Sequence, residues 1–221
     1  MRAYRFLNAE YGLDSLKKRR LKQSRICDLN DPFELTPYDL TDLALRQVFH
    51  KTRDDVSKVK GLVCFSGDWS NPLLWAHYSD KQKGLCLGFE IQEMKGDPEN
   101  DETDHVKYVE KPLTPPANFD ALSDSEFTAF VRKALFTKFN DWDYEKEVRR
   151  WDHLQNEENG LYFLKFDEEK LRLTDVIIGQ QCPLSREKIV EALGSLAGEV
   201  KISKARAAYD KFEMVEDEQG P

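Results

Sequence analysis

The sequence predicts an α+β fold with mixed, mostly antiparallel sheets and flanking helices. Short apolar runs typical of buried strands, such as Gly61–Ser66 and Gly84–Ile91, recur along the chain. Segments with helix-capping signals lie between them, for example Ser123 followed three residues later by Glu126. Strands and helices do not alternate strictly, which argues against a doubly wound parallel sheet.

The composition fits one large domain with a sizeable core. The chain has 221 residues, 40% of them hydrophobic and 11% aromatic, and a formal net charge of -8 from 33 basic and 41 acidic residues. This charge disfavours a protein that coats nucleic acid, although a local basic groove stays open as an alternative. We expect a single domain over residues 1–215 and a disordered tail over residues 216–221.

The cysteines and the apolar runs indicate the cellular compartment of the protein. The four cysteines are scattered without a C-x-x-C pair, which fits free thiols in a reducing compartment better than a zinc site or disulfides. No apolar run approaches the roughly 20 residues of a membrane span. Met1 leads into R-A-Y-R-F without the apolar core of a signal peptide. We therefore expect a cytoplasmic protein with no bound metal and no membrane contact.

The first half of the chain is expected to carry both kinds of element. Asn8 is an N-cap candidate, Asn-Asp-Pro at residues 30–32 is a turn signature, and Asn71-Pro72 provides an N-cap with Pro at the first helical position. The expected elements are strands at 3–6, 61–66 and 84–91, an extended segment at 23–27, and helices at 9–20, 38–50 and 71–78, the second burying Leu40, Leu43 and Val48.

The second half begins with polar residues 92–104, which read as a surface loop. The Ser123–Glu126 capping box predicts a helix as far as about Phe139. The other expected elements are strands at 105–109, 161–166 and 175–179, a helix at 185–197, and strands near Val200 and Phe212.

The segment Asn140–Trp151, N-D-W-D-Y-E-K-E-V-R-R-W, is the main candidate site. Strand alternation places Asp141, Asp143, Glu145 and Glu147 on one face, where four carboxylates repel one another. Either water solvates that face or something cationic lies against it. A charged edge strand is the structural alternative, but the aromatic residues of the segment favour a packed strand.

Other segments offer weaker chemistry. Ser66 and His77, with Asp68 or Asp80, suggest a nucleophile and its base, but the chain has no G-x-S-x-G elbow. Asp31 and Glu34 in L-N-D-P-F-E read mainly as a capped turn, with metal ligation as the alternative.

Several of these segments together resemble the bacterial family called domain of unknown function 2971. The resemblance rests on Y-R-F, L-N-D-P-F-E, C-F-S, W-A-H-Y-S-D-x-x-x-G-x-C-L-G-F and W-x-Y-E-K-E-V-R, which together span most of the chain. The family name implies no activity.

The order of an Arg on the first strand, a Ser ending a middle strand and a later E-x-E also resembles ADP-ribosyltransferases. This resemblance implies that NAD is consumed as substrate, with Glu147 catalytic and Glu145 positioning the acceptor. Arg5 would contact NAD, with Tyr4 competing for that role, and Ser66 would support the nicotinamide side. Trp75 or Tyr78 would stack on nicotinamide. Such an enzyme would be a toxin or phage-defence effector that modifies nucleic acid or protein.

Two other functions fit the same residues. The four carboxylates of the acidic segment are oxygen ligands of the kind that Mg²⁺ prefers, which would suit a metal-dependent nuclease. Alternatively, the aromatic and acidic residues form a non-catalytic module that binds a regulatory protein partner.

Overall fold

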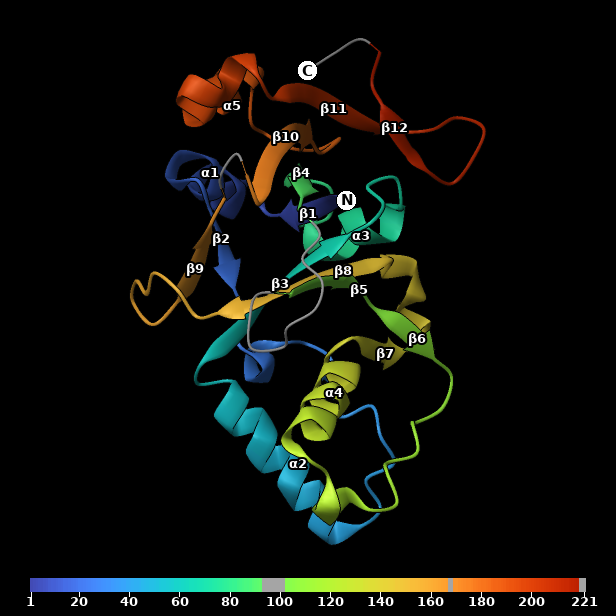
Figure 1. Ribbon diagram of the computed structural model, residues 1–221. Coiled ribbons are helices and arrows are strands. Elements are labelled where there is room, and N and C mark those ends of the chain that lie inside the picture. The colour runs from blue at the N-terminus through green and yellow to red at the C-terminus, as the bar shows by residue number, and fades with distance from the viewer. Residues whose placement is uncertain (93–101, 167–168, 219–221) are drawn as a thin grey trace. The chain divides into compact units, whose positions relative to one another are not determined.

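The computed structural model describes residues 1–92, 102–166 and 169–218 (Figure 1). These residues form helices and mostly antiparallel sheets, which confirms the α+β prediction. The chain divides into two compact units. Unit 1 comprises Met1–Leu21, Phe65–Gln92 and Leu164–Pro221, and unit 2 comprises Lys22–Cys64 and Glu93–Phe163. The expected single domain over residues 1–215 stays a prediction.

Unit 1 is built on a sheet with the strand order β12-β11-β10-β4-β1, to which the end of β3 is added. Only β10 and β11 pair in parallel, whereas the other neighbours are antiparallel. The elements of unit 1 are β1 (Arg2–Leu7), α1 (Ala9–Lys18), α3 (Pro72–Tyr78), β4 (Leu85–Ile91), β10 (Leu171–Ile178), α5 (Arg186–Leu193), η4 (Gly194–Gly198), β11 (Lys201–Ala207) and β12 (Met214–Glu216). Three strands continue from one unit into the other: β2 (Arg20–Gln23), β3 (Lys60–Ser66) and β9 (Tyr162–Lys165).

The two faces of the unit 1 sheet carry different helices. Helix α1 approaches β4 so closely that a Cβ on Gly12 would lie 2.8 Å from the Leu85 side chain. On the opposite face Trp75 of α3 packs its ring edge against Phe6 of β1, with 5.2 Å between the ring centroids. Leu85 lies directly opposite Leu7 on β1, so these two side chains share one face of the sheet. Phe6, the neighbour of Leu7 on β1, points to the opposite face. We therefore call the face that α1 covers the α1 face and the face that α3 covers the α3 face.

Unit 2 places two helices beside a short sheet. Strand β8 pairs with β5 and with β3, and β6 pairs with β7 in parallel. Helices α2 and α4 lie side by side (Figure 1), and their rings Phe49 and Phe130 have centroids 5.1 Å apart. The elements of unit 2 are η1 (Ile26–Asp28), α2 (Leu43–Val56), β5 (Glu102–His105), β6 (Lys107–Val109), η2 (Phe119–Ala121), α4 (Asp124–Leu135), β7 (Thr137–Phe139), η3 (Asn140–Glu145) and β8 (Glu147–His153).

The capping signals located three helix starts correctly. The Asn8 side chain accepts from the amide of Tyr11, and Asn71 caps the amide of Leu73 with Pro72 at the first turn. Ser123 and Glu126 form the complete capping box of α4. Side-chain acceptors bond the otherwise unpaired first amides of a helix, so these starts are readable from the sequence.

The helix expected at 38–50 is shifted towards the C-terminus. Backbone bonds with Leu113 hold residues 37–39 extended, and the helix starts only after its N-cap Asp42. The shift changes the buried face: Leu45 and Phe49 are buried, whereas Leu43 and Val48, expected in the core, are exposed.

The acidic segment is not one strand, which corrects the alternation prediction. Asn140–Glu145 is the 3₁₀ helix η3, Lys146 takes a left-handed conformation with φ 44°, and β8 begins at Glu147. Asn and Asp side chains hydrogen-bond to nearby backbone groups and so favour turns over strands. This local preference for a turn outweighs the alternating strand pattern.

Three other boundaries also differ from expectation. The helix predicted to reach Phe139 ends at Leu135, because Thr137–Phe139 pairs with β6 as strand β7. Of the loop expected at 92–104, residues 102–104 form part of β5, and 93–101 lie outside the described residues. Of the expected tail, Glu216 pairs with Ala205 in β12, and 219–221 lie outside the described residues.

We predict that Asn8→Ala lowers the free energy of unfolding by about 1 kcal/mol, because the first turn of α1 loses its side-chain acceptor. Chemical denaturation followed by circular dichroism measures this change. Asn8→Asp is the matched control and should unfold at the same denaturant concentration as the wild type. Equal losses in both variants would show that the cap does not stabilise α1.

Candidate functional site

Five charged side chains are buried together in unit 2, and we call them the charge cluster. They come from a turn before α2, from β7, from the end of η3 and from β8. Its members are Glu34, Lys138, Glu145, Glu147 and Arg149.

Lys138 joins the two carboxylates of the E-x-E element. Its Nζ lies 2.6 Å from Oε2 of Glu145 and 3.1 Å from Oε2 of Glu147. The same ammonium lies 4.6 Å from the centroid of the Trp142 ring, a distance at which a cation–π attraction adds to the ion pairs. Glu145 and Glu147 thus hold one positive charge between them, although they are not on one strand.

Arg149 joins Glu147 to Glu34. Its Nε donates to Oε1 of Glu147 at 2.8 Å, and its Nη2 donates to Oε2 of Glu147 at 3.1 Å and to Oε1 of Glu34 at 2.7 Å. Its Nη1 donates to the carbonyl of Leu135, the last residue of α4. One guanidinium therefore ties β8 to α4 and to the turn at Glu34, in a bidentate arrangement that Lys cannot reproduce.

Burial and ion pairing have opposite effects on the pKa values of these groups. Glu147 is 4% exposed. Burial by itself would raise the pKa of Glu147, but the charges of Arg149 and Lys138 outweigh it and lower this pKa to about 2. For Lys138 burial lowers the pKa, yet the two facing carboxylates raise it above its ordinary value. Glu147 and Lys138 are therefore both charged at neutral pH.

The charge cluster also has polar neutral neighbours. The backbone amide of Glu147 donates to the hydroxyl of Tyr108 on β6 at 2.8 Å. The thiol of Cys64 on β3 hydrogen-bonds to Glu147 and helps to keep its pKa low. Because a buried carboxylate without partners is costly, this second layer of contacts explains how Glu147 stays ionised in the core.

In unit 1 the predicted cofactor contacts separate onto the two faces of the sheet. Tyr4 of β1 lies directly opposite Ser66 of β3, so their side chains share the α3 face. Arg5 points to the other face, which α1 covers. Tyr4, and not Arg5, is thus the first-strand residue that accompanies Ser66, and burial raises the pKa of its hydroxyl.

The aromatic residues proposed to stack on nicotinamide are placed differently from each other. Trp75 is 0% exposed, and its indole N–H donates to the carbonyl of Trp69 at 2.7 Å. Its ring also packs on Phe6, so its role here is in the core. Tyr78, at the end of α3, is only half-buried and can meet a ligand without a rearrangement of the core.

The Ser66 hydroxyl is engaged in a local turn. It donates to the carbonyl of Asp68 at 2.8 Å and accepts from the amide of the same residue at 3.1 Å. His77 is exposed on α3. These contacts are typical of a hydroxyl that shapes a turn and give no support to a nucleophile–base pair.

Asp175 is a buried carboxylate on the α3 face that the sequence analysis missed. It accepts from Nη2 of Arg2 at 2.6 Å and from the hydroxyl of Thr174 at 2.7 Å. Gly88, opposite on β4, makes room for it, because a Cβ there would lie 3.0 Å from the carboxylate. A register shift between Leu173 and Asp175 marks a bulge that re-aims the side chain. An Asp inside an apolar strand was the only available signal.

The carboxylates proposed to bind Mg²⁺ do not gather. Asp141 and Asp143 are exposed on η3, whereas Glu145 and Glu147 already pair with Lys138. Within residues 1–92, 102–166 and 169–218, no group of three His, Cys, Asp or Glu side chains is placed to hold a metal ion. Asp31 caps the amide of Phe33, and Glu34 pairs with Arg149.

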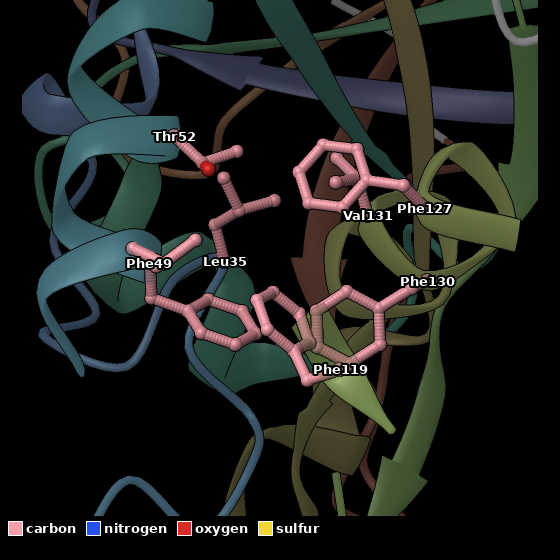
Figure 2. Close-up of a pocket in the computed structure, with 8 residues that line it drawn as sticks. Leu35, Phe49, Thr52, Phe119, Phe127, Phe130 and Val131 are labelled. Atoms are coloured by element: carbon pink, nitrogen blue, oxygen red, sulfur yellow. The ribbon is translucent and has the colours of Figure 1, made fainter. Parts of the chain in front are cut away.

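Unit 2 also contains a small apolar hollow between α2 and α4, which Figure 2 shows with its rings turned towards one another. Its empty volume is ≈ 220 Å³, part of it open to solvent, and Thr52 is its one lining side chain with a polar group. Leu35, next in sequence to Glu34, lies in its wall with a left-handed φ of 61°. The other lining residues are Val48, Phe49, Phe119, Phe127, Phe130 and Val131.

Comparison with known proteins gives one match. Residues 74–150 match the family described as "Protein of unknown function (DUF2971)". This confirms the resemblance over the part of the chain that runs from α3 to β8 and includes W-A-H-Y and the E-x-E element. No curated protein matches the chain. No solved structure matches it either.

None of the helices in the described parts of the chain is long and apolar enough to cross a membrane.

We predict that Glu147→Gln lowers the free energy of unfolding by about 3–5 kcal/mol at neutral pH, because Arg149 and Lys138 each lose a buried ion-pair partner. The folded-state pKa of Glu147 is lowered from 4.5 to about 2. Its stabilising contribution is therefore complete above pH 4.5 and is lost as the pH falls towards 2.

Thermal and chemical unfolding across the acid range measure this difference. The difference in free energy of unfolding between the wild type and Glu147→Gln should become smaller as the pH falls. Asp141→Asn, which removes an exposed carboxylate four residues before Glu145, is the control and should change stability by less than about 0.5 kcal/mol. A difference in free energy of unfolding that stays constant down to the lowest pH would contradict the lowered pKa of Glu147.

Proposed function

We propose that the protein is an NAD-consuming enzyme of the ADP-ribosyltransferase type. The observation that supports this best is the convergence of two carboxylates, those of Glu145 and Glu147, on one positive charge inside unit 2. Cleavage of the bond between nicotinamide and ribose builds up positive charge on the ribose. A fixed, ionised carboxylate in a water-poor site stabilises such a charge strongly.

The proposed roles follow from this chemistry. Nicotinamide leaves with the electron pair of the broken bond, and the acceptor forms the new bond to the same ribose carbon and loses a proton. Glu147 would stabilise the ribosyl cation, and Glu145 would orient the acceptor. Lys138 occupies the place of the cation in this structure, so the proposal requires its ammonium to withdraw from Glu147 when NAD binds.

Tyr4, Ser66 and Tyr78 are the proposed contacts to NAD, as the resemblance to ADP-ribosyltransferases implies. Tyr4 and Ser66 are paired neighbours on the α3 face, which makes Tyr4 a better choice than Arg5. Tyr78 is a better stacking candidate than Trp75, whose ring and indole N–H are used in the core. The acceptor would be a nucleic acid or a protein, and the cellular role that of a toxin or a phage-defence effector in the cytoplasm.

The test is nicotinamide release by the purified full-length chain incubated with NAD, with and without candidate acceptors. We expect Glu147→Gln to lower the release by about 100-fold or more, the usual effect of removing one preorganised electrostatic group. Glu145→Gln should keep NAD hydrolysis but lose transfer to the acceptor. Circular dichroism at the assay temperature establishes that each variant is folded.

Asp141→Asn is the matched control and should release nicotinamide at the rate of the wild type. Absence of release by the wild type with every acceptor would contradict the proposal. Equal rates for the wild type and folded Glu147→Gln would do so as well.

A second candidate function is the binding of a regulatory protein partner. The loop between β11 and β12 protrudes (Figure 1) and carries Tyr209 at 92% and Phe212 at 100% exposure. Arg206 lies over the Tyr209 ring at 4.6 Å. Tyr and Arg are enriched among the residues that dominate protein interfaces. Rings as exposed as these two bury little apolar surface on folding, and exposed apolar groups of this kind often mark a binding surface.

We predict that Phe212→Ser leaves the melting temperature within about 1 °C of the wild type, because the ring has no packing to lose. The same variant should lose the cellular phenotype of the wild type if a partner binds this loop. Tyr11→Ser, at another exposed aromatic position, is the control and should keep the phenotype. An unchanged phenotype in Phe212→Ser would exclude the loop as an essential contact.

A further inference from the structure

The charges of the cluster do not balance. Within the described parts of the chain, three carboxylates (Glu34, Glu145 and Glu147) face two cations (Lys138 and Arg149). All five side chains are buried, between 0% and 8% exposed. A net charge in a buried region is costly, because an ion that leaves water loses its hydration and needs an opposite charge to compensate for the loss.

The hydrogen bonds show which carboxylate is compensated least. Glu147 accepts from Nε and Nη2 of Arg149 and from Lys138. Glu145 accepts from Lys138 at 2.6 Å. Glu34, in contrast, is bonded among the described residues by Nη2 of Arg149 alone, a nitrogen that also serves Glu147.

We infer that Glu34 carries a proton at neutral pH and that this proton makes the charge cluster electrically neutral. The groups that face Glu34 are Lys138 from β7 and Glu147 with Arg149 from β8. Burial raises the pKa of Glu34 and Glu147 adds to the rise, and these effects outweigh the nearby Arg149 and Lys138, which lower it. A protonated Glu34 still accepts from Arg149 through its carbonyl oxygen.

The position of Glu34 makes the proton a switch for the packing of unit 2. The next residue, Leu35, is buried with a left-handed φ of 61° and lines the aromatic hollow between α2 and α4 (Figure 2). That conformation is unfavourable for a non-glycine residue, so the surrounding contacts must hold it in place. Ionised Glu34 gains free energy by moving towards water, and Leu35 then leaves the hollow with it.

The direction of the pH dependence follows from the raised pKa. The contribution of Glu34 to stability is complete below its unfolded pKa of 4.5 and is lost as the pH rises through the higher folded value. This dependence is opposite to that of Glu147. Unit 2 is therefore most tightly packed at an intermediate pH and loosens towards alkaline pH. The inference does not depend on the proposed NAD chemistry.

The experiment is infrared spectroscopy of the full-length chain in D₂O, which separates the C=O stretch of a protonated carboxyl from that of a carboxylate. The wild type should show one protonated-carboxyl band at neutral pH, and the band should disappear on raising the pH. Glu34→Gln, an isosteric change that keeps the hydrogen bond from Arg149, should lack the band. Unfolding of the wild type should become easier across the same pH range, at most about tenfold in the equilibrium constant per pH unit.

Glu145→Gln is the decisive variant, because it removes one negative charge and leaves Glu34 in place. The remaining two carboxylates match the two cations, so Glu34 should ionise and the band should be absent at neutral pH. The inference is overturned if the wild type shows no band. It is equally overturned if Glu34→Gln keeps the band, or if Glu145→Gln keeps it while circular dichroism shows a folded chain.

Discussion

The bidentate ion pair between Arg149 and Glu147 is the interaction on which unit 2 depends most. Arg149 is 0% exposed, and its guanidinium reaches a strand, the end of a helix and a turn that are distant in sequence. A buried guanidinium needs a partner for each of its donors, so these three elements must be placed correctly at the same time. The ion pair therefore specifies an arrangement as much as it stabilises one, a role that polar groups in protein cores can have.

The same cluster connects structure and proposed chemistry. Strong pairing keeps Glu147 ionised in a region of low dielectric, which is the state that the stabilisation of a developing cation requires. Pairing also occupies both oxygens of Glu147. The catalytic role that we propose therefore requires Lys138 to move away from Glu147, whereas a purely structural role does not. Burial and the nearby Glu147 raise the pKa of Glu34, and the proton that we infer on Glu34 removes one negative charge from the surroundings of Lys138.

Local signals in the sequence predicted local structure well. The N-caps Asn8, Asn71 and Ser123 marked helix starts, because a cap acts within four residues of itself. The secondary-structure predictions failed where contacts between residues distant in sequence determine the local conformation. Residues 37–39 are held extended by Leu113, and this delays α2. The left-handed Lys146 divides the acidic segment into a 3₁₀ helix and a strand, which alternation alone could not show.

Only part of the candidate site could be predicted from the sequence, because the rest depends on contacts between residues that are distant in sequence. Glu145 and Glu147 were recognisable as a pair, and something cationic was expected against them. That the cation is Lys138, with Arg149 and Glu34 completing the cluster, depends on how β7, β8 and the turn at Glu34 meet. Lys138 in T-K-F carries no sequence signal of burial, and Asp175 has only its position inside an apolar strand as a signal. The choice between Tyr4 and Arg5 needed the strand register.

The most direct test of this account is a double-mutant cycle between Glu147 and Arg149, with stability measured by chemical denaturation at neutral pH. Glu147→Gln and Arg149→Leu each leave a buried charge without its main partner, so each should be strongly destabilising. The double variant removes both charges and should be far less destabilised than the sum, with a coupling free energy of about 2 kcal/mol or more. Additivity within about 0.5 kcal/mol would contradict the claim that this ion pair organises unit 2.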